Sequence, residues 1–355
     1  MNELKTDSQG ISLVCPLCKS RLSAGEDSFI CPACNRQWPS EDGIVNFSVS
    51  GETYWGEYAE DVMDGLVLRC REAGWKTALR EFFAERDPSY YDYIIKEGRA
   101  DWHFIIPLDR DARILDAGCG WGTLSFALAR MYREIVALDA VRQRVQFIDI
   151  RRNSENAGNI FPVHGQVNYM PFPDEYFDLV VFNGVLEWIP CIEKEKEPCL
   201  SQMEALDEAR RVLKKGGYLY LAIENRWSAM NFLGFRDPHS GLRFAPLLPR
   251  SVANIYSRRA RGRDFREYTY TYGEHRRMLR DAGFTGIRFY APLPSYRNFY
   301  YILPVDDPSM TRFFLDHLVS PRNNLQRFFV SAARLFSFYR YARYFVPDFS
   351  IVARK

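Results

Sequence analysis

Short apolar segments alternate with helical stretches from Arg113 onward, and this alternation limits the possible folds more than any other feature of the chain. The first apolar segment, residues 112–116, leads directly into the loop DAGCGWG (residues 116–122), after which a helix is expected from about Thr123. Strands that alternate with helices are typical of a parallel sheet with crossover helices. The sequence therefore predicts an α/β fold. Its further strands are expected over residues 134–139, 160–164, 177–183 and, after a turn at Gly216-Gly217, 218–224.

The loop after the first strand has glycines at every second position and an acid, Asp116, at the strand end. Glycines allow the backbone to pass close to a ligand. The acid is poorly placed for a pyrophosphate and well placed for a cationic ligand, which distinguishes this loop from a plain dinucleotide motif. About twenty residues further on, the next strand ends in Asp139, where a carboxylate can accept hydrogen bonds from ribose hydroxyls. The loop therefore indicates a cationic ligand, and Asp139 indicates a ribose.

The motifs ILDAGCGWG, ALDA, MPFPDEYFDLVVFNGVLEW and EARRVLKKGGYLYLAIEN occur in this order in the chain. Together they resemble the class I S-adenosylmethionine (SAM)-dependent methyltransferases, over about half of the sequence. The resemblance implies a Rossmann-like sheet that is mostly parallel, with an antiparallel last strand, for which residues 348–353 are the candidate. It also implies that SAM is the cofactor and that methyl transfer is the activity.

The same resemblance assigns SAM contacts residue by residue. Asp116, Gly118 and Gly120 would line the methionine end, Asp139 would hold the ribose hydroxyls, and Asn183 would lie under the methionyl group. Gln166 and Val167 would flank the adenine. Many relatives have Asp where Gln166 stands, but a glutamine carbonyl can also accept the hydrogen bond of the adenine amine.

Four of the eight cysteines form two C-x-x-C pairs, Cys15/Cys18 and Cys31/Cys34. Two such pairs twelve residues apart fit two knuckles that place four thiolates around one tetrahedral Zn²⁺. Two disulfides are the competing interpretation, which a cytosolic chain disfavours. Four thiolates leave no open coordination position, so the expected zinc ribbon has a structural role.

The formal net charge of +2 hides an asymmetry along the chain. Residues 1–225 carry 25 Lys and Arg against 36 Asp and Glu, whereas residues 226–355 carry 22 against 9, and 21 of these 22 bases are arginine. A basic, arginine-rich third suggests an anionic partner, because guanidinium groups make bidentate contacts with carboxylates and phosphates. Internal neutralisation by the acidic remainder is an equally open interpretation.

Methyl transfer needs a positioned nucleophile, and a hydroxyl acceptor usually needs a general base as well. The long region after residue 225 is where such enzymes place their acceptor contacts, so the candidates come mainly from there. His239, in the turn DPHSG, is the first candidate because imidazole titrates near neutral pH. Glu224, Tyr272 and His275 are the others. A histidine in such a turn can also be a simple cap, and Thr271 can cap the helix that follows it.

The chain is expected to have four parts: a zinc ribbon (1–48), a helical linker or cap (49–110), a SAM-binding core (111–225), and a substrate-binding region with the last strands of the sheet (226–355). Arginines and aromatic residues over 327–345 suggest a lid over the substrate pocket. The N-terminus lacks the layout of a signal peptide, and we find no apolar run of about 18 residues, so no transmembrane segment and a cytoplasmic location are expected.

Two hypotheses for the acceptor follow. The favoured one is a small molecule, of the saccharide, nucleotide-sugar or natural-product type, whose anionic group the arginines would hold. The alternative is an rRNA or tRNA methyltransferase that uses the ribbon and the basic third to bind nucleic acid. Against RNA, the ribbon segment 11–48 has three bases and four acids, whereas a nucleic-acid-binding ribbon should be basic. A scaffold protein is disfavoured by the intact cofactor loop.

Overall fold

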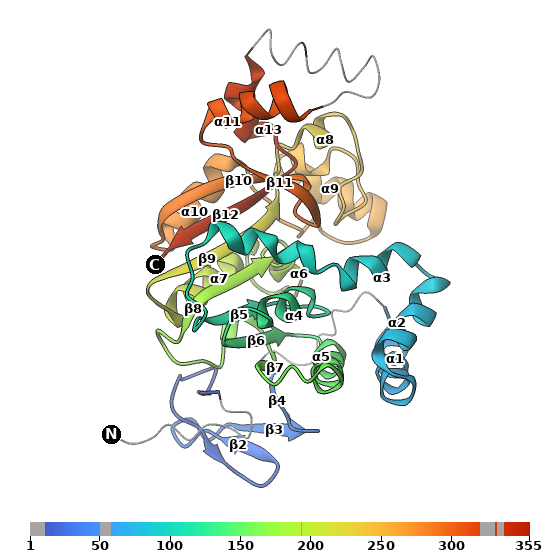
Figure 1. The fold of residues 1–355 in the computed structure, drawn as a ribbon, viewed down its shortest axis with the longest axis vertical. Coiled ribbons are helices and arrows are strands. Elements are labelled where there is room, and N and C mark those ends of the chain that lie inside the picture. The colour runs from blue at the N-terminus through green and yellow to red at the C-terminus, as the bar shows by residue number, and fades with distance from the viewer. Residues whose placement is uncertain (1–10, 50–57, 193, 320–330, 332–336) are drawn as a thin grey trace. The chain divides into compact units, whose positions relative to one another are not determined.

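The structure is a computed structural model, and it describes residues 11–49, 58–192, 194–319, 331 and 337–355 (Figure 1). These residues form two compact units: Met1–Asn183, Glu204–Leu219 and Lys355 in the first, and Gly184–Met203 and Tyr220–Arg354 in the second. No helix in the described ranges is long and apolar enough to cross a bilayer. Of the lid expected over 327–345, residues 327–330 and 332–336 lie outside the described residues.

The first unit contains a parallel sheet, which a small antiparallel ribbon precedes in the sequence. Its strands are β1 (Ser23–Ala24), β2 (Ser28–Ile30), β3 (Gln37–Glu41), β4 (Ile44–Phe47), β5 (Arg113–Ala117), β6 (Glu134–Asp139), β7 (Ile160–Gly165) and β8 (Phe177–Asn183). They follow the order β1-β2-β3-β4-β7-β6-β5-β8. Strand β5 pairs in parallel with β6 and β8, and β6 pairs in parallel with β7. The prediction of an α/β fold with a parallel sheet is confirmed.

The strands of this sheet are apolar because both of their faces are covered. All six residues of β6 are buried, as a strand between two layers of helices requires. The helices of the unit are α1 (Glu60–Ala73), α2 (Trp75–Ala84), α3 (Pro88–Ile95), α4 (Thr123–Ala129), α5 (Arg142–Glu155) and the 3₁₀ helices η1 (Glu97–Ile105) and η2 (Val167–Tyr169).

The ribbon belongs to the first unit and is not a separate module. Its strand β4 pairs in parallel with β7, with Asn46 opposite His164. The backbone N–H of Val14 donates to the Pro171 carbonyl at 3.0 Å, and Lys19 forms a 2.7 Å ion pair with Glu208. The ribbon therefore extends the edge of the parallel sheet.

Helix α7 (Pro198–Val212) and strand β9 (Leu213–Glu224) each contribute residues to both units. Strand β9 begins at Leu213, so the expectation of a turn at Gly216-Gly217 before a strand from residue 218 is wrong. The reason is a distant pairing. Gly216 N–H donates to the Lys355 carbonyl at 3.2 Å, and Lys355 N–H donates to the Gly217 carbonyl at 3.0 Å.

The second unit has an antiparallel sheet in which β10 (Thr285–Ser295) pairs with both β11 (Asn298–Pro304) and β12 (Asp348–Arg354). The expected antiparallel strand near the C-terminus is thereby confirmed. Thr271 begins α10 with a capping box, because its hydroxyl accepts from Glu274 N–H and the Glu274 carboxylate accepts from Thr271 N–H. The helices of the unit are α6 (Ile189–Ile192), α8 (Ala229–Phe232), α9 (Arg250–Arg261), α10 (Tyr272–Asp281), α11 (Pro308–Phe313), α13 (Ala342–Phe345), the 3₁₀ helices η3 (Ala245–Leu247) and η5 (Phe338–Tyr341), and the π-helix η4 (Phe314–Leu318).

Candidate functional site

The glycine loop after β5 is held against the end of β6 by backbone hydrogen bonds. The N–H groups of Gly118 and Cys119 donate to the Leu138 carbonyl at 2.7 and 3.0 Å, and Gly120 N–H donates to Asp139 Oδ2 at 2.8 Å. Gly118 and Gly120 have φ values of 74° and 55°, in the region that favours glycine. A Cβ on Gly120 would meet no described atom within 4 Å, so the loop borders open space at this residue.

Two polar side chains of the first unit lie at the ends of neighbouring strands. Asp116 is 2% exposed and accepts a 2.6 Å hydrogen bond from Ser125, and burial raises the pKa of its carboxyl to about 6. The side-chain oxygen of Asn183 is buried and accepts no hydrogen bond from the described residues. Such an oxygen needs a donor. The open space at Gly120 and the unpaired oxygen of Asn183 fit a bound ligand with amine or ammonium donors, as SAM has.

The expected adenine contacts lie where β7 ends. The side-chain oxygen of Gln166 accepts a hydrogen bond from Val49 N–H at 3.3 Å, and Val167 begins η2. Both Asp139 oxygens accept backbone hydrogen bonds, Oδ2 from Gly120 and Oδ1 from Val141, and Oδ1 also accepts from Arg144 Nη1 at 3.4 Å.

The four ribbon cysteines converge in the first unit. Their sulfur atoms all lie within 4.8 Å of one another, with 3.7 Å between Cys15 and Cys34 and 3.3 Å between Cys18 and Cys31. These separations are far from the S–S bond length of about 2.0 Å. They are close to the edge of about 3.8 Å that four thiolates form around Zn²⁺ at about 2.3 Å. The donor set and its geometry therefore fit a tetrahedral metal.

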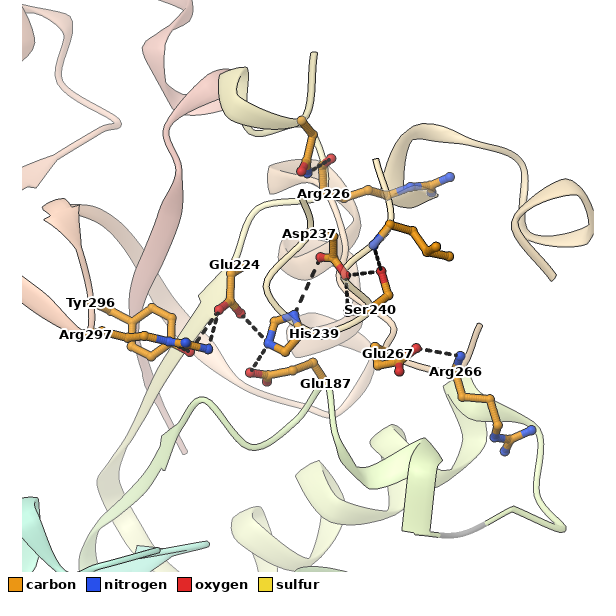
Figure 2. Close-up of polar contacts among 12 residues, drawn as sticks. Glu187, Glu224, Arg226, Asp237, His239, Ser240, Arg266, Glu267, Tyr296 and Arg297 are labelled. Atoms are coloured by element: carbon orange, nitrogen blue, oxygen red, sulfur yellow. Dashed lines mark hydrogen bonds and ion pairs between the residues drawn. The ribbon is translucent and has the colours of Figure 1, made fainter. Parts of the chain in front are cut away.

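In the second unit, two of the four candidate catalytic residues meet. His239 Nε2 lies 3.3 Å from Glu224 Oε2 and 3.4 Å from Glu187 Oε1 (Figure 2). Glu224 is the last residue of β9, and Glu187 lies between β8 and α6. On the other side of the ring, His239 Nδ1 lies 3.7 Å from Asp237 Oδ1, and Trp188 packs edge-on with its ring centre 4.8 Å from that of His239.

Burial and charge set the ionisation of this cluster. Burial alone would lower the pKa of His239, but the surrounding carboxylates of Glu224, Asp237 and Glu187 outweigh it and raise that pKa to about 11. Burial raises the pKa of Glu224, and the charge of His239 opposes the shift. Burial raises the pKa of Asp348 to about 7, and the negative charge of Glu224 contributes to the same shift. In this arrangement His239 is a cation at neutral pH.

The other two candidates, Tyr272 and His275, lie on α10 and are not part of the cluster. The Tyr272 hydroxyl donates to Asp306 at 2.5 Å, and its ring packs on Phe289. The His275 side chain is fully buried, and its ring packs against those of Tyr270 and Phe349. Burial lowers the pKa of His275 to about 3, so its imidazole is neutral.

Sequence reasoning did not select Glu187 or Asp237. The signal for Glu187 was available, since it is a lone acid among the apolar residues VLEWIP that follow the fourth parallel strand. A charged residue inside an apolar run is rarely fully buried without a function. Tyr296 and Arg297, whose side chains lie 3.0 and 3.3 Å from Glu224 Oε1, come from the β10–β11 turn and carry no such signal.

Residues 115–221 match the model of a methyltransferase domain family. An uncharacterized chloroplastic methyltransferase of Arabidopsis thaliana, At2g41040, is 27% identical over 205 residues, which cover 53% of this chain and 52% of that protein. The demethylmenaquinone methyltransferase of Geobacillus kaustophilus is 27% identical over 194 residues, which cover 51% of this chain and 74% of that protein. The chain thus spans about half the length of the first of these relatives and three quarters of the second.

Among solved structures, the YcgJ protein of Bacillus subtilis is similar at 15% identity with a TM-score of 0.41, covering 73% of this chain and 97% of that one. The family match over residues 115–221 agrees with the motif-based resemblance to methyltransferases.

Proposed function

We propose that this protein is a SAM-dependent methyltransferase that methylates an oxygen or nitrogen atom of a small molecule. The observation that carries the proposal is the methyltransferase domain over residues 115–221, with the glycine loop intact. In this proposal SAM supplies the activated methyl group. Gly118, Gly120, Asp116 and Asn183 hold its methionine part, and Asp139 holds its ribose.

The adenine of SAM would lie against Gln166 and Val167. In this assignment the side-chain oxygen of Gln166 accepts a hydrogen bond from the adenine amine. The four-part division of the chain and the cytoplasmic location remain predictions of the same proposal.

We assign the acceptor contacts to the cluster of Glu187, Glu224 and His239. Glu187 follows Asn183, the proposed methionyl contact, by four positions in the chain. The side chains of Glu187 and His239 are fully buried and Trp188 packs on the His239 ring, which favours a small acceptor group over an extended polymer. Catalysis would consist mainly of positioning, since the sulfonium methyl is already activated.

The arginines give limited support to an anionic acceptor. Several pair with acids of their own unit: Arg258 with Asp264, and both Arg261 and Arg263 with Glu267. These pairs favour internal neutralisation for this part of the basic third. Arg297, beside Glu224, is the arginine placed to contact an acceptor, and its side chain is 42% exposed.

The ribbon is proposed to hold a structural Zn²⁺ through Cys15, Cys18, Cys31 and Cys34. A segment of this size buries too little apolar surface to fold alone, so the metal would supply its stability. The ribbon contacts within the first unit give it a structural task that needs no nucleic acid.

Label transfer from methyl-labelled SAM into a cell extract, fractionated into RNA, lipid and small polar pools, tests the proposed function. We expect label in the small polar pool or in a lipid-linked pool, which would also identify the fraction for mass spectrometry. Label in ribonuclease-sensitive material would overturn the small-molecule acceptor and favour the RNA methyltransferase instead. No label in any pool, from protein that binds SAM, would contradict methyl transfer to a cellular acceptor.

A further inference from the structure

Glu187 is a buried carboxylate without a hydrogen-bond donor. Its side chain is 0% exposed, and neither of its oxygens accepts a hydrogen bond from any residue that the structure describes. Taking an ionised carboxylate out of water costs several kcal/mol unless a cation or hydrogen bonds compensate. Either protonated His239 or a bound cation must therefore compensate its charge.

The nearest group, His239, does not compensate well by hydrogen bonding. Its Nε2 lies 3.4 Å from Glu187 Oε1 and 3.3 Å from Glu224 Oε2, and these separations exceed the usual range for N–H···O bonds. One ring nitrogen also cannot donate its single hydrogen well to two carboxylates. The same separations match the edge of about 3.4 Å between ligands that surround a tetrahedral ion at about 2.1 Å.

The other nitrogen of His239 is oriented as in a metal site. Asp237 Oδ1 is the carboxylate oxygen on the Nδ1 side, at 3.7 Å, while Asp237 Oδ2 accepts from Ser240 N–H at 2.7 Å and from the Ser240 hydroxyl at 2.5 Å (Figure 2). Nδ1 and Oδ1 are too far apart for a hydrogen bond, but the carboxylate still favours a proton on Nδ1, so a cation bound at Nε2 would displace the other proton of the imidazolium. Glu224 is oriented in a similar way, because its Oε1 accepts from Tyr296 and Arg297 and its Oε2 faces His239.

The formal charges of the cluster do not balance. Tyr296 connects Asp348 to the group, since its N–H donates to Asp348 and its hydroxyl donates to Glu224. Arg297 contributes one positive charge, and His239 contributes one at most. Up to four carboxylates oppose them, those of Glu187, Glu224, Asp237 and Asp348, and burial raises the pKa of Glu224 and of Asp348 and so reduces their charge.

We propose that Glu187, Glu224 and His239 bind a divalent cation through Oε1, Oε2 and Nε2. The three atoms lie within 4.8 Å of one another. One imidazole with two carboxylates suits Mn²⁺, Fe²⁺ or Zn²⁺, whereas the thiolates of the ribbon select Zn²⁺. Three protein ligands leave coordination positions open, so this is a site of the catalytic kind rather than a closed structural one. An acceptor oxygen could occupy an open position, where the ion would lower its pKa and a water molecule would take its proton.

A protonated amine of an acceptor is the main competing occupant. It would supply one positive charge where a divalent ion supplies two, and it would not use the Nε2 lone pair that Asp237 favours. The proposal concerns metal binding alone. Metal binding can fail while the methyltransferase function stands, and the methyltransferase function can fail while metal binding stands.

Manganese is the probe, because Mn²⁺ prefers oxygen and nitrogen ligands and does not compete for the ribbon thiolates. The full chain, with its zinc retained, is titrated with Mn²⁺, and free Mn²⁺ is measured by its electron paramagnetic resonance signal. We expect about one bound Mn²⁺ per chain. Asp237→Asn should weaken Mn²⁺ binding by about 10–100-fold, the usual effect of removing a carboxylate that orients a metal ligand. Glu187→Gln should weaken it more, because it removes a ligand itself. The matched control is Glu267→Gln, a buried glutamate of the same unit paired with Arg261, which should bind Mn²⁺ normally.

Thermal unfolding of protein stripped of metal at the cluster provides the second readout. Glu187→Gln removes the uncompensated charge, so its melting temperature should equal or exceed that of the wild type, and added Mn²⁺ should raise only the wild-type value. The absence of a Mn²⁺ site in the wild type, or equal binding by Glu187→Gln, would overturn the proposal. A lower melting temperature of stripped Glu187→Gln would also overturn it, because the carboxylate would then stabilise His239 without a metal.

Discussion

The cysteine cluster of the first unit and the Glu187–Glu224–His239 cluster of the second unit both hold their donor atoms within 4.8 Å, but the chain builds them in different ways. The cysteines lie between residues 15 and 34, on two tight turns, and their spacing alone indicates a metal. The three residues of the other cluster come from a loop, a strand end and a turn that are far apart in the sequence. A metal motif is therefore readable only where local turns set the ligand geometry.

The largest expected effect concerns the local cluster. Cys31→Ser removes a buried ligand of the proposed zinc, and the zinc contribution to folding in small modules is on the order of 10 kcal/mol. We expect loss of the bound zinc and unprotected amides over residues 11–47, measured by hydrogen exchange, while β5, β6 and β8 remain protected. Cys199→Ser, at a cysteine outside the cluster, is the control and should keep the zinc. Retention of zinc and of protection in Cys31→Ser would show that the ribbon folds without it.

The second largest effect concerns the assembled cluster. Glu224→Gln should reduce methyl transfer to the acceptor found in the labelling experiment by roughly 100-fold or more, because it removes a charge that positions or activates the acceptor. Tyr272→Phe should change the rate by less than about threefold, since the Tyr272 hydroxyl bonds Asp306 outside the cluster. Steady-state rates with each variant check both values. Equal losses in the two variants would mean that the cluster is not the acceptor site.

The sequence predicted those features that depend on residues close to one another in the chain. The glycine loop, the positions of the parallel strands along the chain, the Thr271 cap and the convergence of four cysteines all follow from short-range patterns. It selected His239 and Glu224 separately but could not pair them, and it overlooked Glu187. Their proximity depends on the turn at 237–241 and on the path of β9, which no spacing rule encodes. The same cause explains the error at Gly216, whose strand partner, Lys355, is the last residue of the chain.

The buried histidine of α10, His275, provides a pH test of the comparison. His275 is neutral because burial lowers its pKa to about 3, below the usual value of about 6.5, so the unfolded state binds more protons between these pH values. Its contribution is therefore fully present above pH 6.5 and is lost as pH falls through the window toward 3. Between pH 6.5 and 5 the loss should be roughly 2 kcal/mol.

Urea unfolding at both pH values measures this loss. His275→Leu should flatten the dependence on pH, whereas a substitution of the exposed His317 by Gln should leave it unchanged. An unchanged slope in His275→Leu would mean that the buried ring is protonated in the folded protein.

The smallest effect tests a contact that the sequence predicted and whose partners lie three residues apart. Thr271→Ala removes the hydroxyl that accepts from Glu274 N–H, and loss of such a cap typically costs about 1 kcal/mol. Thr285→Ala, at an exposed threonine of β10 in the same unit, is the control. Thermal unfolding at neutral pH should show a lower free energy of unfolding for Thr271→Ala only. Because the cap acts within one helix, the loss should be the same with and without Mn²⁺ at the Glu187 cluster. A loss that depended on Mn²⁺ would show that α10 and the assembled cluster are coupled, and the separation of Tyr272 and His275 from the site would then fail.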